Sequence, residues 1–307
     1  MNTTNNILDR IAAKTRERIS EEMRQVPLSE IRRLAEQVLQ DSPAVHSAPF
    51  SSGANGTGAS VLPDPHDFSP RGGSFRRALA KPGISFICEV KKASPSKGVI
   101  AEHFPYLDIS KEYEAAGAAA ISCLTEPHWF LGSDQYLREI ASQVSIPVLR
   151  KDFTISPYMI YQAKAYGASA ILLICSILDD AELRDYLQLA NELHLDVLTE
   201  AHSAEEIERA VKAGAQIIGV NNRNLKTFEV DVENSRRLRA LAPRDAIFVS
   251  ESGIRTAEDI RALYENGTDA VLIGETLMRA DDKRAMLKEL TRLLPKEPRE
   301  EKKHEQD

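Results

Sequence analysis

Eight short apolar runs recur along this chain at intervals of about 20 to 35 residues, and no other feature limits the possible folds as strongly. The runs are FICEV, AAISCL, IPVLRKD, ASAILLIC, LDVLTE, QIIGVN, AIFVSES and DAVLIG. Amphipathic stretches such as DDAELRDYLQLANELH separate them, and several of these end near a glycine, as helix C-caps do. Eight alternations of strand and helix, with strands rich in Val, Ile and Leu, predict an α/β fold: a single closed parallel (β/α)8 barrel, or TIM barrel. A doubly wound open sheet is the alternative, because a sequence does not show closure.

Segments of different composition flank the predicted barrel, which we place at residues 67–294. Apolar residues recur at helical spacing up to Met23, and Pro27 with Ser29 begins a second helix through Leu39. Residues 1–41 are therefore expected to form an N-terminal helical extension. Residues 42–66 are rich in Ser, Gly and Pro and predict a flexible linker. Residues 295–307 carry many charges and no apolar side chain, which predicts a disordered tail.

The composition argues against several classes of partner. A formal net charge of -7 disfavours nucleic-acid binding, because such proteins usually gather a basic excess on one face. No stretch approaches the roughly 20 apolar residues that span a bilayer, so we expect no membrane association and a cytoplasmic location. Cys88, Cys123 and Cys175 lie in apolar runs without metal-site or redox spacing, and we expect them to be reduced core residues.

Charged and polar residues gather at the carboxyl ends of the predicted strands, where the loops of such barrels build active sites. Glu89 and Lys91 are two residues apart at the end of the first run and therefore point to the same, interior face. Later runs end in further polar residues: Lys151, Glu200, Asn221 and Arg223. For any one of them the alternative is that it simply meets water. Together, acids and bases at one rim predict a site that holds both a proton donor and a proton acceptor.

The last two strands are followed by turns of small residues, in VSESGI and LIGETLM. Such turns expose backbone N–H groups at the start of a helix, and the loops after strands seven and eight form the usual phosphate site of these barrels. A single Ser-Gly pair is more often an ordinary turn. Two such turns on adjacent strands predict a phosphate site.

Seven segments, in order, resemble the motifs of indole-3-glycerol phosphate synthases: CEVKKASPSKG, LRKDF, LLIC, LTEAH, GVNNRNLKT, SESGI and LIGETLM. The resemblance runs from about Ile84 to Leu293, and ILDRI near the amino terminus resembles the family's extra segment, which packs over the barrel mouth. It implies a carbon–carbon lyase of tryptophan biosynthesis that converts 1-(2-carboxyphenylamino)-1-deoxyribulose 5-phosphate to indole-3-glycerol phosphate with loss of CO2 and water. The implied partner is this small anionic sugar phosphate, and neither a metal nor another cofactor is implied. The sequence predicts no particular protein partner.

The resemblance also implies roles for individual residues. Lys151 matches a general acid that acts on the substrate's ketone oxygen, and Glu200 matches a glutamate that transfers a proton during dehydration. Lys91 matches a second lysine that contacts the substrate carboxylate, and Glu89 orients the lysines. The remaining matches fall into three groups: Asn221 and Arg223 in the substrate-holding polar network; Ser94, Ser252, Gly253 and Gly274 around the phosphate and the site wall; and Phe130, Phe153, Leu172 and Leu225 in an apolar pocket for the anthranilate ring.

Two features depart from the family pattern. Glu275 stands where some members have serine, and we expect its backbone N–H to serve the phosphate while its side chain turns away. The stretch between the front helices and the barrel is longer than expected. The alternative functions are another phosphate-binding barrel enzyme, such as an isomerase or a Schiff-base aldolase, and a non-catalytic scaffold.

Overall fold

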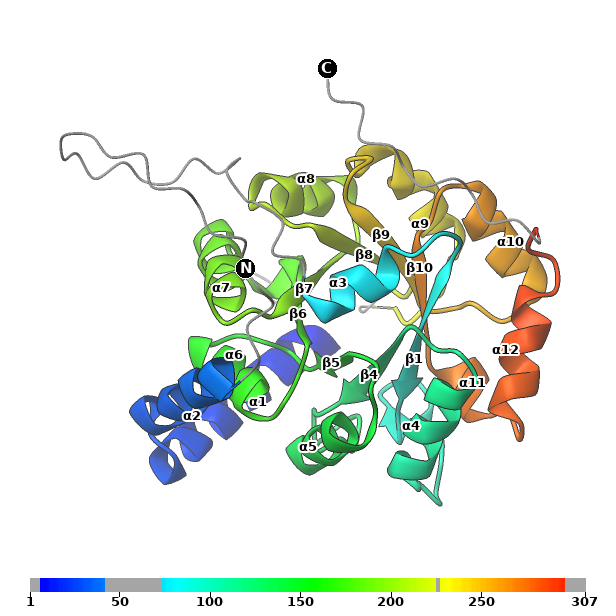
Figure 1. Cartoon of the computed structure of the whole chain (residues 1–307). Coiled ribbons are helices and arrows are strands. Elements are labelled where there is room, and N and C mark those ends of the chain that lie inside the picture. Colours follow the sequence, from blue (N-terminus) through cyan, green and yellow to red (C-terminus); the bar gives the residue numbers. More distant parts are fainter. Residues whose placement is uncertain (1–5, 42–72, 225–226, 296–307) are drawn as a thin grey trace, which may run out of the picture.

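Eight parallel strands close into a barrel, and helices surround it (Figure 1). The computed structural model describes residues 6–41, 73–224 and 227–295 of the chain. The strands are β1 (Ser85–Val90), β4 (Ala120–Leu124), β5 (Val148–Lys151), β6 (Ala170–Ile174), β7 (Asp196–Ala201), β8 (Ile217–Asn221), β9 (Ile247–Glu251) and β10 (Ala270–Ile273). Each pairs with its chain neighbours, and β1 pairs with both β4 and β10. The predicted TIM barrel is confirmed, and closure of the barrel excludes the alternative of a doubly wound open sheet.

A helical segment follows every barrel strand, as the alternating pattern predicted. These are α4 (Tyr106–Ala115), α5 (Asp134–Gln143), α6 (Pro157–Ala165), η1 (Cys175–Ile177) with α7 (Asp180–Glu192), α8 (Ala204–Lys212), α9 (Glu233–Leu238) with η2 (Arg239–Leu241), α10 (Ala257–Glu265), and α11 (Glu275–Met278) with α12 (Lys283–Thr291). A short hairpin of β2 (Ala93–Ser94) and β3 (Gly98–Val99) precedes α4. Hydroxyl and carboxylate caps begin several helices; Ser156 and Asp179, for example, accept backbone N–H bonds of α6 and α7.

Apolar side chains fill two layers that the strands separate. The inner layer contains buried residues from alternate positions of the strands, including Ile87, Leu149, Leu198 and Val249. The outer layer lies between strands and helices and includes Ile121, Ile171, Ile218 and Phe248. Cys88, Cys123 and Cys175 are free and buried in this outer layer, as predicted. Because side chains alternate along each strand, the inner layer fixes which residues at the strand ends face the barrel axis.

The short helix α3 (Ser74–Leu79) closes the amino-terminal end of the barrel. Phe75 and Leu79 are fully buried in the inner layer. The carboxylate of Asp196, at the start of β7, accepts hydrogen bonds from the N–H groups of Gly73 and Arg76, at 3.1 and 2.9 Å. The opposite end, where the strands terminate, is therefore the open end of the barrel.

Two further helices, α1 (Ile7–Gln25) and α2 (Leu28–Asp41), precede the barrel. Leu8 and Ile11 of α1 pack into the inner layer at the open end, whereas α2 packs against α6 on the side of the barrel through Ile31. The linker predicted at 42–66 and the tail from 296 onward lie outside the described residues. In the part of the chain that is described, no helix is long and apolar enough to cross a bilayer.

Candidate active site

A cavity of about 360 Å³ lies at the carboxyl ends of the strands. All fourteen site residues predicted from the sequence line it: Glu89, Lys91, Ser94, Phe130, Lys151, Phe153, Leu172, Glu200, Asn221, Arg223, Ser252, Gly253, Gly274 and Glu275. They come from all eight strands or from the loops that follow the strands, so the closed barrel brings together residues far apart in sequence. Leu225, which was also expected in the apolar pocket, lies outside the described residues.

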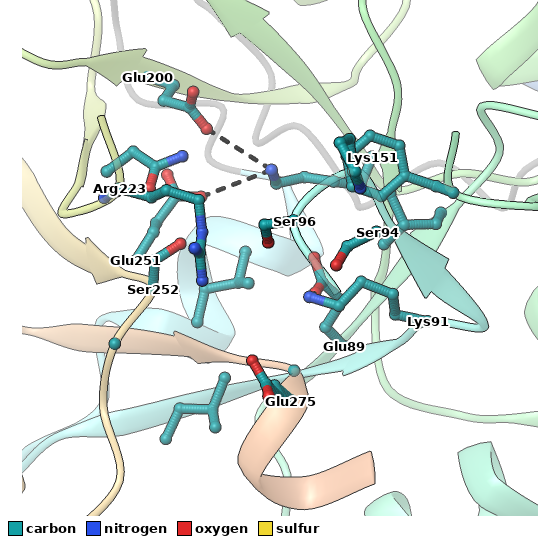
Figure 2. Close-up of a pocket in the computed structure, with 18 of the residues that line it drawn as sticks. Glu89, Lys91, Ser94, Ser96, Lys151, Glu200, Arg223, Glu251, Ser252 and Glu275 are labelled. Atoms are coloured by element: carbon teal, nitrogen blue, oxygen red, sulfur yellow. Dashed lines mark hydrogen bonds and ion pairs between the residues drawn. The ribbon is translucent and has the colours of Figure 1, made fainter. Parts of the chain in front are cut away.

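Lys151, at the end of β5, extends between the carboxyl groups of Glu200 on β7 and Glu251 on β9 (Figure 2). Its Nζ lies 3.5 Å from Oε2 of Glu200 and 3.6 Å from Oε2 of Glu251. Burial disfavours the charged amine, but the surrounding carboxyl groups, above all the charge of Glu200, outweigh burial and raise the pKa of Lys151 above its ordinary value. Lys151 is therefore an ammonium ion at neutral pH, able to give a proton and unable to attack a carbonyl carbon.

Glu251, at the end of β9, is a site residue that the sequence analysis did not identify. It is 1% exposed, and its Oε1 has no hydrogen-bond partner among the described residues. Burial and the charge of Glu200 raise its pKa from 4.5 to about 8, against the opposing effect of Lys151. Its carboxyl group occupies space beside Gly219, where a Cβ would collide with Oε1. The site therefore contains a carboxylic acid that stays protonated at neutral pH.

Glu89 and Lys91 form a second ion pair at the end of β1. Lys91 Nζ donates a hydrogen bond to Oε2 of Glu89, and both side chains face the cavity, as their two-residue spacing predicted. A Cβ on Gly274 would lie 2.7 Å from Nζ of Lys91 and would also collide with Oε2 of Glu89. Gly274 was expected to make room for phosphate; it also makes room for this ion pair.

Asn221 is the last residue of β8, and Arg223 lies two positions beyond it. Oδ1 of Asn221 accepts the backbone N–H of Arg223 at 3.0 Å, and a guanidinium nitrogen of Arg223 donates to the carbonyl oxygen of Phe228 at 3.1 Å. Asn221 is buried and Arg223 is partly exposed. These bonds fix the loop after β8 so that the guanidinium of Arg223 reaches the cavity (Figure 2).

An apolar wall faces the charged groups. The rings of Phe130 and Phe153 are tilted against each other with centroids 6.0 Å apart, and Leu172 is buried at the cavity surface. The loop that carries Phe130 is held by Glu126, whose carboxylate accepts the backbone N–H groups of three successive residues, at 2.7 to 3.0 Å: His128, Trp129 and Phe130. A planar aromatic group fits against such a wall.

The turns after β9 and β10 meet at one side of the cavity. Ser252 and Gly253 have φ of 69° and 82°, and a Cβ on Gly253 would collide with Val230. Thr276, in α11, donates a hydrogen bond to the carbonyl oxygen of Ile254 at 2.7 Å, which joins the two turns. The Glu275 side chain lies at the cavity edge, with Oε1 3.1 Å from Nε of Arg279 and 3.7 Å from Nζ of Lys97 (Figure 2).

Asp152 is a second lining residue that the sequence analysis did not single out. It is fully buried directly after Lys151, and both of its oxygens accept hydrogen bonds at 2.9 Å from Arg18 of α1. Burial opposes ionisation, but Arg18 and Arg150 outweigh it and lower the pKa of Asp152. The ion pair between Arg18 and Asp152 ties the N-terminal helix to the strand end that carries Lys151.

Comparison with known proteins agrees with this site. Residues 53–290 match the family described as indole-3-glycerol phosphate synthase. The chain is 52% identical to the indole-3-glycerol phosphate synthase of Ruminiclostridium cellulolyticum, over 92% of this chain and 98% of the relative. It is 48% identical to the enzyme of that name from Lachnoclostridium phytofermentans, over 94% of this chain and the whole relative.

Among solved structures, the similarity is one of fold. Thiamine phosphate pyrophosphorylase from Pyrococcus furiosus aligns with a TM-score of 0.52 at 17% identity, over 70% of this chain and 96% of the other. A mutant tryptophan synthase α-subunit from the same organism aligns with a TM-score of 0.53 at 14% identity, over 69% of this chain and 99% of the other. The match to the family over most of the barrel, together with close relatives of nearly equal length, means that this chain belongs to the indole-3-glycerol phosphate synthase family.

Proposed function

We propose that this protein is an indole-3-glycerol phosphate synthase, a decarboxylating lyase of tryptophan biosynthesis. It converts 1-(2-carboxyphenylamino)-1-deoxyribulose 5-phosphate to indole-3-glycerol phosphate, CO2 and water. One observation supports this best: Lys151, an ammonium ion in the resting site, lies between two buried carboxyl groups in a cavity with an aromatic wall. The arrangement suits acid catalysis on a substrate that carries an aromatic ring and a ketone.

Ring closure needs a proton at the ketone oxygen. When the ring carbon that bears the carboxylate attacks the ketone carbon, negative charge develops on that oxygen, and the ammonium group of Lys151 donates a proton to it. Because Glu200 and Glu251 hold this amine in place, little reorganisation accompanies the transfer. A proton donor and a positive charge held at one atom together account for a large part of such a rate enhancement.

Loss of CO2 follows from the same intermediate. The carbon–carbon bond to the carboxylate breaks, and its electron pair restores the aromatic ring. Lys91 is suited to hold the carboxylate until this step, because its ammonium group faces the cavity and is held by Glu89. The CO2 that leaves is neutral, so its attraction to Lys91 falls as the bond breaks.

Dehydration then completes the indole. The hydroxyl group formed from the ketone leaves as water after it takes a second proton, and a carbon-bound proton is removed by a base. We assign the base to Glu200. Glu251 is a protonated neighbour that can give a proton to the leaving hydroxyl group. Two carboxyl groups in one site then perform opposite tasks, because their surroundings differ.

Substrate binding divides between the two sides of the cavity. The anthranilate ring packs on Phe130, Phe153 and Leu172, and the phosphate binds backbone N–H groups of the turns after β9 and β10. Leu8 and Ile11 of α1 line the same cavity, so we propose that the N-terminal extension shields the substrate from water. The three free buried cysteines suit a reducing compartment, and we propose a cytoplasmic location.

The direct test is to add the substrate to purified protein and follow indole fluorescence, with and without EDTA. The proposal predicts product in both cases. Borohydride added during turnover separates the alternative aldolase, because a Schiff-base enzyme would gain mass on one lysine. No indole product, or a trapped lysine adduct, would overturn the proposed function.

A further inference from the structure

A second, polar cavity adjoins the first. It has a volume of about 460 Å³ and shares Leu8 and Asn221 with the active-site cavity. Its lining includes His202, Glu206, Glu229, Asp231 and Arg237, and the last three of these are exposed, so the cavity opens to solvent. A substrate bound on the aromatic wall of the first cavity would not occupy this second one.

His202 stands between Glu200 and the second cavity. Its Nε2 lies 3.5 Å from Oε1 of Glu200, whereas Oε2 of the same carboxylate faces Lys151. On its other side, Nδ1 lies 3.4 Å from Oε2 of Glu206. The same Glu206 oxygen accepts the backbone N–H of His202 at 2.7 Å, so this bond joins the strand end to α8 beside the ring. Nε2 of His202 has no hydrogen-bond partner among the described residues, but Lys151, Glu200 and His202 lie in a row with 3.5 Å between the facing atoms, and this row leads to the second cavity.

The groups around His202 favour a transient positive charge on its ring. Carboxyl groups face it from its own strand (Glu200), from α8 (Glu206) and from β9 (Glu251). Arg237 of α9 lines the same cavity and is paired with Asp231 at 2.9 Å. Burial disfavours the imidazolium, but the hydrogen bond to Glu206 and the charge of Glu200 outweigh it and raise the pKa of His202 above 6.5.

The proposed reaction needs a proton from outside in every cycle. The substrate's carboxylate leaves as neutral CO2, and its ketone oxygen leaves as water. Two protons are added to that oxygen and one is removed from carbon, so each turnover takes up one proton from solvent. Substrate or product in the first cavity would block the direct route from solvent to Lys151.

We propose that His202 is a proton relay that recharges Glu200 and Lys151 from the second cavity while product still occupies the first cavity. This inference rests on the proposed function. In the relay step, solvent in the second cavity protonates Glu206, Oε2 of Glu206 passes the proton to Nδ1 of His202, the Nε2–H bond breaks, and Oε1 of Glu200 gains the proton from Nε2. Glu200 then passes it to the neutral amine of Lys151. The ring stays neutral overall, and its rotation restores the starting tautomer.

The test compares one turnover with many in His202→Ala. Because the resting site already stores protons on Lys151 and Glu251, a single turnover with excess enzyme should change less than about threefold. Steady-state kcat should fall about 10-fold or more, in the range of a lost positioned proton carrier. Added imidazole, which can enter the open second cavity, should restore kcat in a concentration-dependent and saturable way.

Two further variants serve as controls. His202→Gln keeps a polar side chain beside Glu206 but carries no proton, so it should show the same slow steady state without rescue by imidazole. Glu205→Gln changes an exposed neighbour of Glu206 on α8 and should leave both rates unchanged. Thermal unfolding of each variant checks that the barrel is intact.

The outcomes separate the two proposals. If wild-type protein forms no indole product, the proposed function fails and the relay fails with it. If the wild type is active but His202→Ala keeps its steady-state rate, the relay alone is wrong. Equal slowing of single and multiple turnovers, without imidazole rescue, would show that His202 only supports the structure of Glu200 and would also refute the relay.

Discussion

Replacing Glu251 with glutamine should change how the stability of the barrel depends on pH. The pKa of this buried carboxyl is raised from 4.5 to about 8 in the folded chain. The folded protein therefore keeps its proton over a range in which the unfolded chain has lost it, and stability falls as pH rises from about 4.5 through 8. The free energy of unfolding falls by about 1.4 kcal/mol per pH unit, or by roughly 4 kcal/mol between pH 5 and pH 8.

Glutamine has nearly the same shape and does not titrate. At pH 5 the variant and the wild type should have similar free energies of unfolding, because both carry a neutral group at this position. At pH 8 the variant should be more stable relative to the wild type by about 4 kcal/mol. Urea unfolding at each pH unit from 5 to 8 measures this difference, provided that the denaturant slopes of the two proteins agree.

The difference in free energy of unfolding between variant and wild type reports on Glu251 alone, because both proteins share all other titrating groups. Glu112→Gln, an exposed position on α4, is the matched control and should differ from the wild type by no more than about 0.5 kcal/mol at every pH. A flat difference between Glu251→Gln and the wild type over this range would mean that the carboxyl is ionised in the folded protein throughout. The assignment of Glu251 as a neutral acid would then be refuted.

Other variants test the roles of single groups. Lys151→Ala should lower kcat by about 100-fold or more and slow CO2 and indole formation together, whereas Glu200→Gln should let CO2 release outrun indole formation in single turnovers that follow both products. Gly274→Ala should lower kcat and raise KM, because its methyl group displaces the ion pair on β1; unchanged kinetics would contradict this packing. Glu275→Ser should change kcat and KM only slightly in a steady-state assay, because the phosphate binds the backbone N–H and not the carboxylate. Arg18→Met should lower the free energy of unfolding, measured in urea, by about 2 to 4 kcal/mol, because it leaves the buried carboxylate of Asp152 with fewer partners.

The sequence predicted the barrel and most of the cavity for the same physical reason. Side chains alternate along a strand, so a polar residue two positions beyond an inner-layer residue must face the axis. Lys151 follows Leu149 in this way, and Glu200 follows Leu198. Glu251 follows Val249 by the same rule, but its motif had been interpreted only as a phosphate turn. The signal for this residue was present in the sequence.

Other parts of the site depend on contacts that no local pattern reveals. Arg18 and Asp152 are 134 positions apart, and an amphipathic helix has many exposed arginines that resemble Arg18 in sequence. The turn at Glu126 likewise serves Phe130 through a carboxylate that collects backbone N–H groups, which depends on loop geometry. Such pairings follow from the closed barrel and the docked helix, and they can be read only once both are in place.

The bond between Arg18 and Asp152 makes the first helix part of the thermodynamics of the active site. Because α1 lines the cavity and also holds the residue next to Lys151, any ligand that prefers the ordered strand end must also prefer the docked helix. By reciprocity, docking of the helix raises the affinity for that ligand by the same factor. Ligand binding in the cavity should therefore increase the protection of the α1 amides against hydrogen exchange, so exchange rates measured in α1 detect substrate binding.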